Sequence, residues 1–425
     1  MDNKVWDCVV IGGGVAGLVA STFLARSGKA VLVLEKSKQL GGRGQTIEKH
    51  GSYLNLGPHA IYEKGIAYKV LTELELEVKG GKVPTSGKIV DKENVYDLPG
   101  DALKLLTSPM LSWNGKKEAL RFFTTYKKID TSSMKSVRLS KWLNHNIKSE
   151  EVRKFIQMLI RLATYSNDID EISAGAALRQ LQLGNAIYLE DGWQTMIRAL
   201  KEKAREYGVA FLTGAKVEQI KGVFPNMQVL TQGRDPIDTK NIVSTVSPQE
   251  VTALLREYGN PVDFDTFKNL KPVKVACLDL ILSSLPLRNI HFALGLEQPF
   301  YYSNHSNVTK LSYDGKNHVV HVMKYLSASG IEDQDQVLTE LVDFMDRIQP
   351  GWENFVIYKR YLPRMTVSHS AVKADKSGLL GRPTHSVKHI PGLYLAGDWV
   401  GGEGMLVDAS FNSAVQVAET ILESS

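Results

Sequence analysis

The sequence predicts an α/β protein in which a parallel sheet covered by helices is interrupted by a second, α+β region. Two observations lead to this prediction. Near the start of the chain, glycine-rich turns alternate with short apolar runs and a helical segment. Apolar runs of the same kind return near residues 242 and 393, after long stretches of different character. A chain of 425 residues also exceeds what one small core needs, so two domains are expected.

The first three elements follow from local pattern. The apolar run over residues 5–11 predicts a buried parallel strand, and residues 16–27 predict a helix on one face of that sheet. Gly28 ends the helix, and residues 30–34 form a second apolar strand that ends at Glu35.

Between the first strand and the helix lies the pattern Gly12-x-Gly14-x-x-Gly17, with Ala16 inside it. In a strand-to-helix context the first glycine permits the tight turn, and the second lets a pyrophosphate approach the backbone. The third brings the helix close to the strand. The helix N-terminus then attracts the diphosphate. The alternative is a glycine-rich turn without a ligand.

Glu35 stands 18 residues after Gly17, where an acid accepts hydrogen bonds from ribose hydroxyls, and Lys36 follows it. A carboxylate at this position repels a 2′-phosphate, so NADP is disfavoured.

The remaining pieces of this domain are scattered along the chain. They are a helix from residue 191 to 205, strands at 209–212, 217–220, 242–246 and 392–398, and a helix at 407–422. The segments between them read as helical over 79–189 and as strands over 273–383. We therefore predict one nucleotide domain made of residues 1–78, 190–272 and 384–425, and a substrate domain made of 79–189 and 273–383.

Composition narrows the partners and the compartment. The net charge of +5 is small and the Lys and Arg residues are spread along the chain, so nucleic acid binding is not expected. Cys8 and Cys277, the two cysteines, suit a reducing compartment. No signal segment precedes the first strand and no apolar run reaches the length of a membrane span, so a cytoplasmic location is expected.

Residues 102–128 mix apolar and aromatic side chains with lysine and arginine. One interpretation is a basic amphipathic helix that lies on a membrane surface, and the other is a helix that roofs an apolar pocket.

The stretch from the first strand through Gly41-Gly42-Arg43 resembles the flavin amine oxidase superfamily, which includes phytoene desaturases and protoporphyrinogen oxidases. Ser21 departs from the family pattern, which usually has alanine there. The resemblance implies a Rossmann-like FAD-binding domain (GR2 type) with an interleaved α+β substrate domain. It also favours FAD over NAD. The cysteine that attaches FAD in some members has no counterpart, so noncovalent FAD is expected.

The resemblance also implies roles for further residues. Gly42 and Arg43 would approach the pyrophosphate, and Val217 would contact adenine through its backbone. Asp398, after Gly397, would accept from cofactor hydroxyls. The helix that starts near Met405, Leu406 and Val407 would direct its N–H groups at the flavin N1–C2 edge.

Two residues are candidates for catalysis. His59, in the loop Gly57-Pro58-His59, would contact the flavin or act as an acid or base; otherwise it is a loop histidine. Lys274 stands where related amine oxidases hold a water at flavin N5, although a lysine on a solvated edge strand is the simpler interpretation.

Side chains of the substrate region are less specific. Trp399 either packs on the flavin or serves the core, and Tyr301 and Tyr302 resemble substrate-side strand residues of desaturases. No Ser-His-Asp triad and no metal-ligand spacing is visible, so no metal is expected.

These observations predict an FAD-dependent oxidoreductase that transfers a hydride to flavin N5 from an apolar or amine-bearing small molecule. We expect desaturase-like or dehydrogenase-like chemistry, with oxygen or a quinone as electron acceptor. An amine oxidase using oxygen is the alternative. The rivals are an NAD-dependent dehydrogenase and a non-catalytic, prenyl-binding escort like the Rab GDP-dissociation inhibitors.

Overall fold

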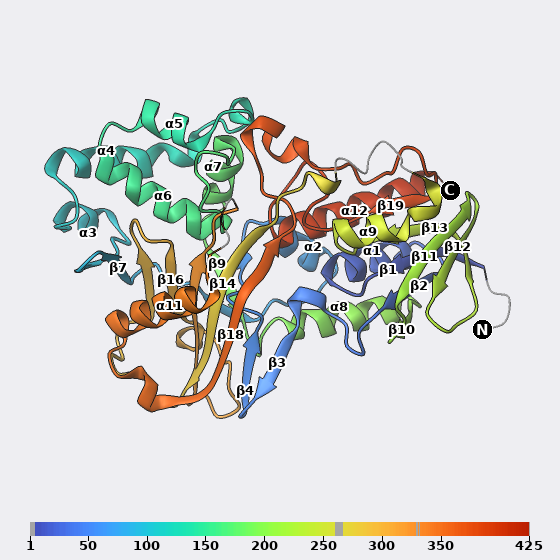
Figure 1. Cartoon of the computed structure of the whole chain (residues 1–425), viewed down its shortest axis with the longest axis horizontal. Helices are drawn as coiled ribbons and strands as arrows, with labels where there is room; N and C mark the ends of the chain where they lie inside the picture. Colours follow the sequence, from blue (N-terminus) through green and yellow to red (C-terminus); the bar gives the residue numbers. More distant parts are fainter. Residues whose placement is uncertain (1–4, 260–266, 329, 331, 425) are drawn as a thin grey trace.

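The computed structural model describes residues 5–259, 267–328, 330 and 332–424. Two seven-stranded sheets organise the molecule, and helices cover both (Figure 1). The mixed α/β class predicted from the sequence is confirmed.

The first sheet has a parallel centre built from distant parts of the chain. Its strands run in the order β10 (Ala210–Thr213), β2 (Val31–Glu35), β1 (Trp6–Ile11), β13 (Ile237–Ser244), β12 (Asn226–Thr231) and β11 (Val217–Val223). β19 (Leu393–Leu395) pairs in parallel with β13 as well. All seven strands come from segments that the sequence assigned to the nucleotide domain; the domain boundaries themselves stay a prediction.

Helices bury both faces of this sheet because its strands are apolar on both sides. On one face, α1 (Val15–Arg26), α8 (Gln194–Glu206) and α12 (Val407–Glu423) share a core with Cys8 and Val10 of β1. On the other face, Val9 and Ile11 join a core that includes α9 (Pro248–Leu254). β1, α1 and α12 begin and end within one residue of the sequence prediction, whereas β13 begins five residues before the predicted strand 242–246, and β12 and α9 were not predicted.

The second sheet is mixed, in the order β18 (Val356–Ser368), β14 (Val273–Leu282), β17 (His318–Tyr325), β16 (Phe300–Asn304), β15 (Phe292–Gly295), β7 (Lys88–Asp91) and β8 (Asn94–Asp97). Its two faces are covered differently. α11 (Gln334–Ile348), which the sequence analysis did not identify, packs on Ala276 and Leu278 of β14. The opposite face, with Val275 and Cys277, meets a layer of helices.

That layer consists of α3 (Ala102–Thr107), α4 (Trp113–Thr125), α5 (Leu139–Asn146), α6 (Glu150–Thr164) and α7 (Ala174–Gln182). A single helix over residues 102–128 is therefore wrong. Asp101 and Ser112 each cap a separate helix by accepting from a backbone N–H, and Pro109 lies in the break between the two helices.

Smaller elements connect the two regions. α2 (Ile66–Glu73) lies beside the nucleotide sheet, and β3 (Thr46–Lys49) pairs with β4 (Ser52–Asn55). A third sheet joins β5 (Ile61–Tyr62), β9 (Ala186–Leu189) and β6 (Gly80–Lys82). Among the described residues, no helix has the length and apolar character needed to cross a membrane.

Candidate functional site

A cavity of about 1160 Å³ begins where β1 and β2 end and extends toward the second sheet. Ligands of open α/β sheets bind at the carboxyl ends of the strands, so its position is that of a nucleotide site. The volume is large enough for a dinucleotide and a second, smaller molecule. The described residues of 102–128 do not line the cavity, so the pocket-roof interpretation of that segment is wrong.

The glycine-rich turn has the geometry that its sequence predicts. Gly12 has a φ of +107°, a conformation that side chains disfavour. A Cβ on Gly17 would lie 1.9 Å from the carbonyl oxygen of Gly12, so only glycine lets α1 approach β1 this closely. Gly12, Gly14 and Ala16 line the cavity, whereas Gly17 supports the turn from behind.

The N-terminus of α1 faces the cavity without a side-chain cap. Gly14 occupies the N-cap position, and Val15 and Ala16 of the first turn line the cavity. The unpaired N–H groups and the helix dipole at such an end favour a bound phosphate. Gly41 donates its N–H to the carbonyl oxygen of Gly13 at 2.8 Å, which holds the Gly41-Gly42-Arg43 segment against the turn.

Glu35 ends β2 at the cavity wall, as predicted. Its two carboxylate oxygens accept from the N–H groups of Gly13 and Ser37, each at 2.8 Å, which fixes the side chain in place. Lys36 also lines the cavity and pairs with Glu250 at 2.6 Å. Val217, the first residue of β11, lies on the same wall.

Arg43 and Asp398 form an ion pair at 2.7 Å beside the cavity, and both line it. His369, which the sequence analysis missed, donates its backbone N–H to the same carboxylate at 3.2 Å and places its ring Nδ1 3.2 Å from the other oxygen. Burial alone would raise the pKa of Asp398, but Arg43 and His369 hold it well below its ordinary value. The carboxylate is therefore ionised at neutral pH.

The last helix starts at the cavity, close to the predicted position. Leu406 has a φ of +56° and precedes α12, so the chain turns sharply before the helix begins. Leu406, Val407 and Ser410 line the cavity, but Met405 is buried in a small core and does not.

These residues fit a flavin dinucleotide. The turn at Gly12 leaves no room for a Cβ on Gly17, while a Cβ on Gly14 would meet nothing nearer than 3.9 Å in the protein. Two uncapped helix starts, at α1 and α12, face the same cavity and supply positive dipole ends for a diphosphate and for an electron-rich ring.

His59 lies on the cavity wall next to Trp193, with ring centroids 4.6 Å apart. Its Nδ1 donates to the carbonyl oxygen of Gly57 at 3.0 Å. Burial lowers the pKa of His59 to about 4 despite this hydrogen bond, so the imidazole is uncharged at neutral pH. Gly57 itself, with a φ of +74°, shapes the turn but does not line the cavity.

Lys274 is not brought to the cavity. In strand β14, successive side chains point to opposite faces, and Lys274 shares the face of Ala276 and Leu278, which pack under α11. It is absent from the cavity lining. The structure therefore does not support a lysine that holds a water near the reacting atoms at this position. The solvated edge strand is also wrong, because β14 pairs with β17 on one side and with β18 on the other.

Tyrosines form the wall opposite the nucleotide turn. The hydroxyl groups of Tyr188 and Tyr301 lie 3.1 Å apart, and both side chains line the cavity. His305 stacks on the ring of Tyr188 with centroids 3.5 Å apart and places Nε2 3.3 Å from the Tyr301 hydroxyl. Tyr302 points to the opposite face, where its hydroxyl donates to the carbonyl oxygen of Ile290. Trp399 lines the cavity.

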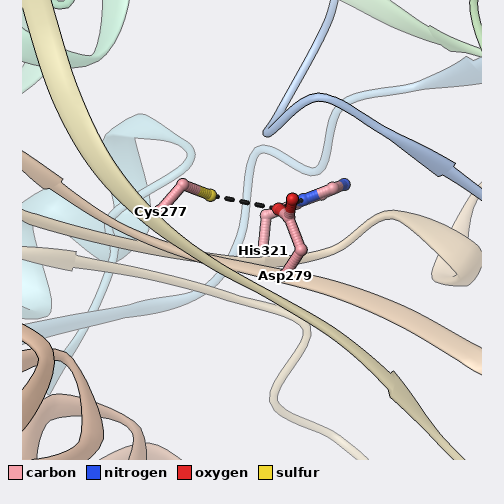
Figure 2. A group of neighbouring side chains, drawn as sticks. All are labelled: Cys277, Asp279 and His321. Carbon is pink, nitrogen blue, oxygen red and sulfur yellow. Dashed lines mark hydrogen bonds and ion pairs between the residues drawn. The ribbon is translucent and has the colours of Figure 1, made fainter. Parts of the chain in front are cut away.

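Next to His305, whose ring centroid lies 4.5 Å from that of His321, is a buried cluster that sequence spacing did not reveal (Figure 2). Cys277 and Asp279 come from β14, and His321 faces Asp279 from the paired strand β17. Asp279 Oδ1 accepts from the thiol of Cys277 at 3.1 Å and from His321 Nδ1 at 2.6 Å.

These three side chains present donor atoms within 4.8 Å of one another, which is close enough for a metal ion. Arg360, however, already places its Nε 3.0 Å from Asp279 Oδ2. Burial would raise the pKa of Asp279, but His321 and Arg360 hold it below its ordinary value. We interpret the cluster as a buried ion pair because the guanidinium supplies the positive charge that a metal would otherwise bring.

Comparisons with known proteins agree with this geometry. The family model for "Flavin containing amine oxidoreductase" matches residues 15–422. The 1-hydroxycarotenoid 3,4-desaturase of Flavobacterium sp. (strain P99-3) is 24% identical over 50% of this chain and 50% of its own length. The chloroplastic prolycopene isomerase of Daucus carota is 24% identical over 93% of this chain and 77% of its own length. With several other curated relatives, including L-amino-acid oxidases, the match spans far less of their length.

Solved structures show the same fold. An oxidoreductase from Methanosarcina mazei superimposes with a TM-score of 0.77 at 19% identity, covering 97% of this chain and 99% of the other. A putrescine oxidase variant gives a TM-score of 0.76 at 15% identity and covers 99% of each chain. A putative protoporphyrinogen oxidase from Exiguobacterium sp. 255-15 gives 0.72 at 17% identity over 100% of both chains.

Proposed function

Because the chain belongs to the family of flavin containing amine oxidoreductases, we propose that it is an FAD-dependent oxidoreductase that removes a hydride from an apolar, uncharged small molecule. The supporting observation is the single cavity that joins the nucleotide turn to a tyrosine-lined wall. Bound FAD would supply the hydride acceptor, its N5 atom. The protein's part is to hold the cofactor, exclude water and orient the substrate.

The cofactor would be held by the residues that line the nucleotide half of the cavity. Gly12, Gly14 and the start of α1 would receive the diphosphate, and Glu35 would accept from ribose hydroxyls. The start of α12 would stabilise negative charge on the reduced ring. Noncovalent binding is supported because the chain's two cysteines, Cys8 and Cys277, are fully buried and lie outside the cavity lining.

The position of the acidic residues supports an uncharged substrate. Four carboxylates line the described cavity, and all belong to the nucleotide half: Glu35, Glu218, Glu250 and Asp398. The opposite wall is formed mainly by leucine, methionine and tyrosine side chains, namely Leu162, Tyr165, Tyr188, Tyr301, Leu362 and Met365. The charged residue beside them in the lining, Arg364, is a cation. An ammonium group there would lack an anionic partner, which is costly in a buried site. Desaturation or dehydrogenation of an apolar molecule is therefore favoured over oxidation of an amine.

The tyrosines would also help to remove the proton that is released when the substrate is desaturated. Loss of a hydride and a proton from adjacent atoms creates a double bond, and the proton needs an acceptor. The linked hydroxyls of Tyr188 and Tyr301 would relay this proton, each passing on its own proton as it takes up the next, to the imidazole of His305, whose Nε2 lies 3.3 Å from the Tyr301 hydroxyl. Electrons would then pass to oxygen or a quinone. No relative reported above supports a non-catalytic escort role.

Two measurements test the proposal. The visible spectrum of the purified protein should show flavin absorption that survives desalting; a protein that stays colourless after FAD is added contradicts the proposal. Anaerobic mixing with lycopene, protoporphyrinogen IX or putrescine then separates the substrate classes. We expect lycopene, which is uncharged, to bleach the flavin. Bleaching by protoporphyrinogen IX alone, which carries two propionates, would contradict an uncharged substrate, and bleaching by putrescine alone would favour an amine oxidase.

A further inference from the structure

The helical end of the molecule has a large excess of positive over negative side chains. Residues 102–154 contain twelve Lys and Arg but only four Asp and Glu, which gives a net charge of +8, whereas the whole chain has +5. The rest of the chain is therefore net negative. Helices α3 to α6 contain this segment, and Figure 1 shows them gathered at one end of the molecule, away from the first sheet.

Acidic side chains of this segment accept hydrogen bonds from backbone N–H groups within the same segment. Glu118 accepts from the N–H groups of Lys148 and Ser149, both at 2.8 Å, before α6 begins. Glu151 accepts from the N–H of Ser112 at 2.9 Å, at the start of α4. These carboxylates are directed at backbone groups between helices.

Six basic side chains on or next to α3 and α4 form no ion pair with any acidic residue that the structure describes. Across the described part of the chain, none of the following forms an ion pair: Lys104, Lys116, Lys117, Arg121, Lys127 and Lys128. Free cations on adjacent turns attract an extended anionic surface more strongly than they attract a single anion.

Two large apolar side chains stand among these cations. Leu103 on α3 is 72% exposed and Trp113 at the start of α4 is 62% exposed, although Leu105 and Phe122 of the same helices are buried. The Lys117 ammonium lies 5.6 Å from the centre of the Trp113 ring. Tryptophan beside lysine is a combination that suits the boundary between lipid headgroups and acyl chains.

We propose that α3 and α4 form a docking surface for an anionic lipid membrane, with Leu103 and Trp113 inserted between headgroups and the surrounding lysines and arginine paired with lipid phosphates. The exposed aliphatic side chain of Leu103 favours lipid over nucleic acid, because bases can stack on an aromatic ring such as that of Trp113 but gain nothing comparable from leucine. Because the positive charge is spread over two helices, an extended membrane surface is favoured as the partner over a single acidic loop of another protein. The proposal is independent of the substrate, because these residues lie outside the cavity lining.

The test is co-sedimentation of the flavin-loaded protein with vesicles of phosphatidylcholine alone or mixed with phosphatidylglycerol. We expect binding only when phosphatidylglycerol is present, and weaker binding at high salt. Brominated acyl chains should quench part of the tryptophan fluorescence, and Trp113→Phe should remove that part. Equal sedimentation with both vesicle types, or with neither, overturns the proposal.

Paired variants locate the surface. Lys116→Glu with Lys117→Glu, and separately Leu103→Ser with Trp113→Ser, should each weaken vesicle binding by about tenfold or more. The matched controls are Lys388→Glu and Phe224→Ser, exposed positions on the nucleotide side, which should bind like the wild type. An unchanged far-ultraviolet circular dichroism spectrum verifies folding. Equal loss in the controls, or binding of poly(U) RNA or poly-glutamate in place of vesicles, contradicts the assignment.

Discussion

Arg43 donates to the carboxylate of Asp398 at 2.7 Å, and this contact joins two residues that are 355 positions apart in the chain. It connects the segment after β2 to the segment after β19 at the edge of the cavity. Asp398 is almost fully buried, whereas the Arg43 side chain is 44% exposed, so the pair forms part of the wall that faces the cofactor site.

Asp398→Asn should lower FAD retention and destabilise the protein by about 1–2 kcal/mol, because Arg43 and His369 lose an anionic acceptor. The exposed guanidinium can still reach water, which limits the cost. Flavin lost on desalting and urea-induced unfolding measure the two effects. Asp7→Asn, which breaks a surface pair with Lys240, is the control and should keep its flavin. Full retention by Asp398→Asn would remove the proposed role.

Two glycines of the same turn should respond differently to alanine. In Gly17→Ala, the new Cβ lies 1.9 Å from the carbonyl oxygen of Gly12, so the protein should lose about 2 kcal/mol or more of stability. In Gly14→Ala, the nearest protein atom is 3.9 Å away, so the protein should fold normally. The methyl group would nevertheless project toward the diphosphate and weaken FAD binding roughly tenfold or more. Thermal unfolding and FAD titration of the apoprotein distinguish these outcomes. Tight FAD binding by Gly14→Ala would show that the diphosphate lies elsewhere.

Asp408 should make the protein less stable as pH rises through the acidic range. Its carboxylate, 2% exposed on α12, accepts from the Ala67 N–H at the start of α2, but burial raises its pKa to about 6. Between the unfolded pKa of 3.8 and this value, the native state binds more protons than the unfolded state. The free energy of unfolding should therefore fall by up to about 3 kcal/mol from pH 4 to pH 6. Asp408→Asn keeps the acceptor and should abolish this slope in urea titrations; an identical slope in the variant contradicts the assignment.

His59 should have the opposite effect. Its pKa of about 4 in the folded protein lies below the ordinary 6.5, so the unfolded state binds more protons between these values. Stability should be lost as pH falls from 6.5 to 4, by about 3 kcal/mol at most. His59→Gln should remove this loss without changing stability at pH 8 by more than about 1 kcal/mol. Nuclear magnetic resonance of the ring protons tests the cause directly, because a His59 signal that titrates near pH 6.5 would be incompatible with burial in the uncharged form.

Lys274 should be dispensable for flavin chemistry, because it lies on the α11 face of β14. In Lys274→Met, the photoreduced flavin should be reoxidised by oxygen at a rate within about twofold of the wild type. This measurement needs no substrate. A fall of tenfold or more would show that the lysine reaches the flavin after all.

Local pattern was sufficient to predict the nucleotide half of the site. The turn at Gly12, the acid at Glu35 and the segment Gly41-Gly42-Arg43 depend on residues close together in sequence, and the structure brings them to one cavity. The start of α12 was placed correctly because a glycine-rich loop precedes an amphipathic helix.

The substrate half depends on distant pairings that a single sequence does not reveal. Asp279 meets His321 only because β14 and β17 pair in a particular antiparallel register. His369 reaches Asp398 from the segment just after β18. The side of the sheet on which Lys274 lies could not be read from the sequence either, since a shift of one residue along a strand moves a side chain to the opposite face. The sequence analysis also missed α11, although its amphipathic pattern was present.

The discontinuity of the nucleotide sheet has a consequence for biosynthesis. β1, α1 and β2 are synthesised more than 350 residues before β19 and α12. The later elements complete the parallel centre and pack on α1. The diphosphate site at the start of α1 therefore lacks Asp398 and the start of α12 until those residues have been translated. Pairings between such distant segments form slowly and leave apolar strands unprotected in the meantime. The yield of folded protein should accordingly increase with the flavin supplied during expression. The cofactor can stabilise the domain only after β19 has been synthesised and has paired with the sheet.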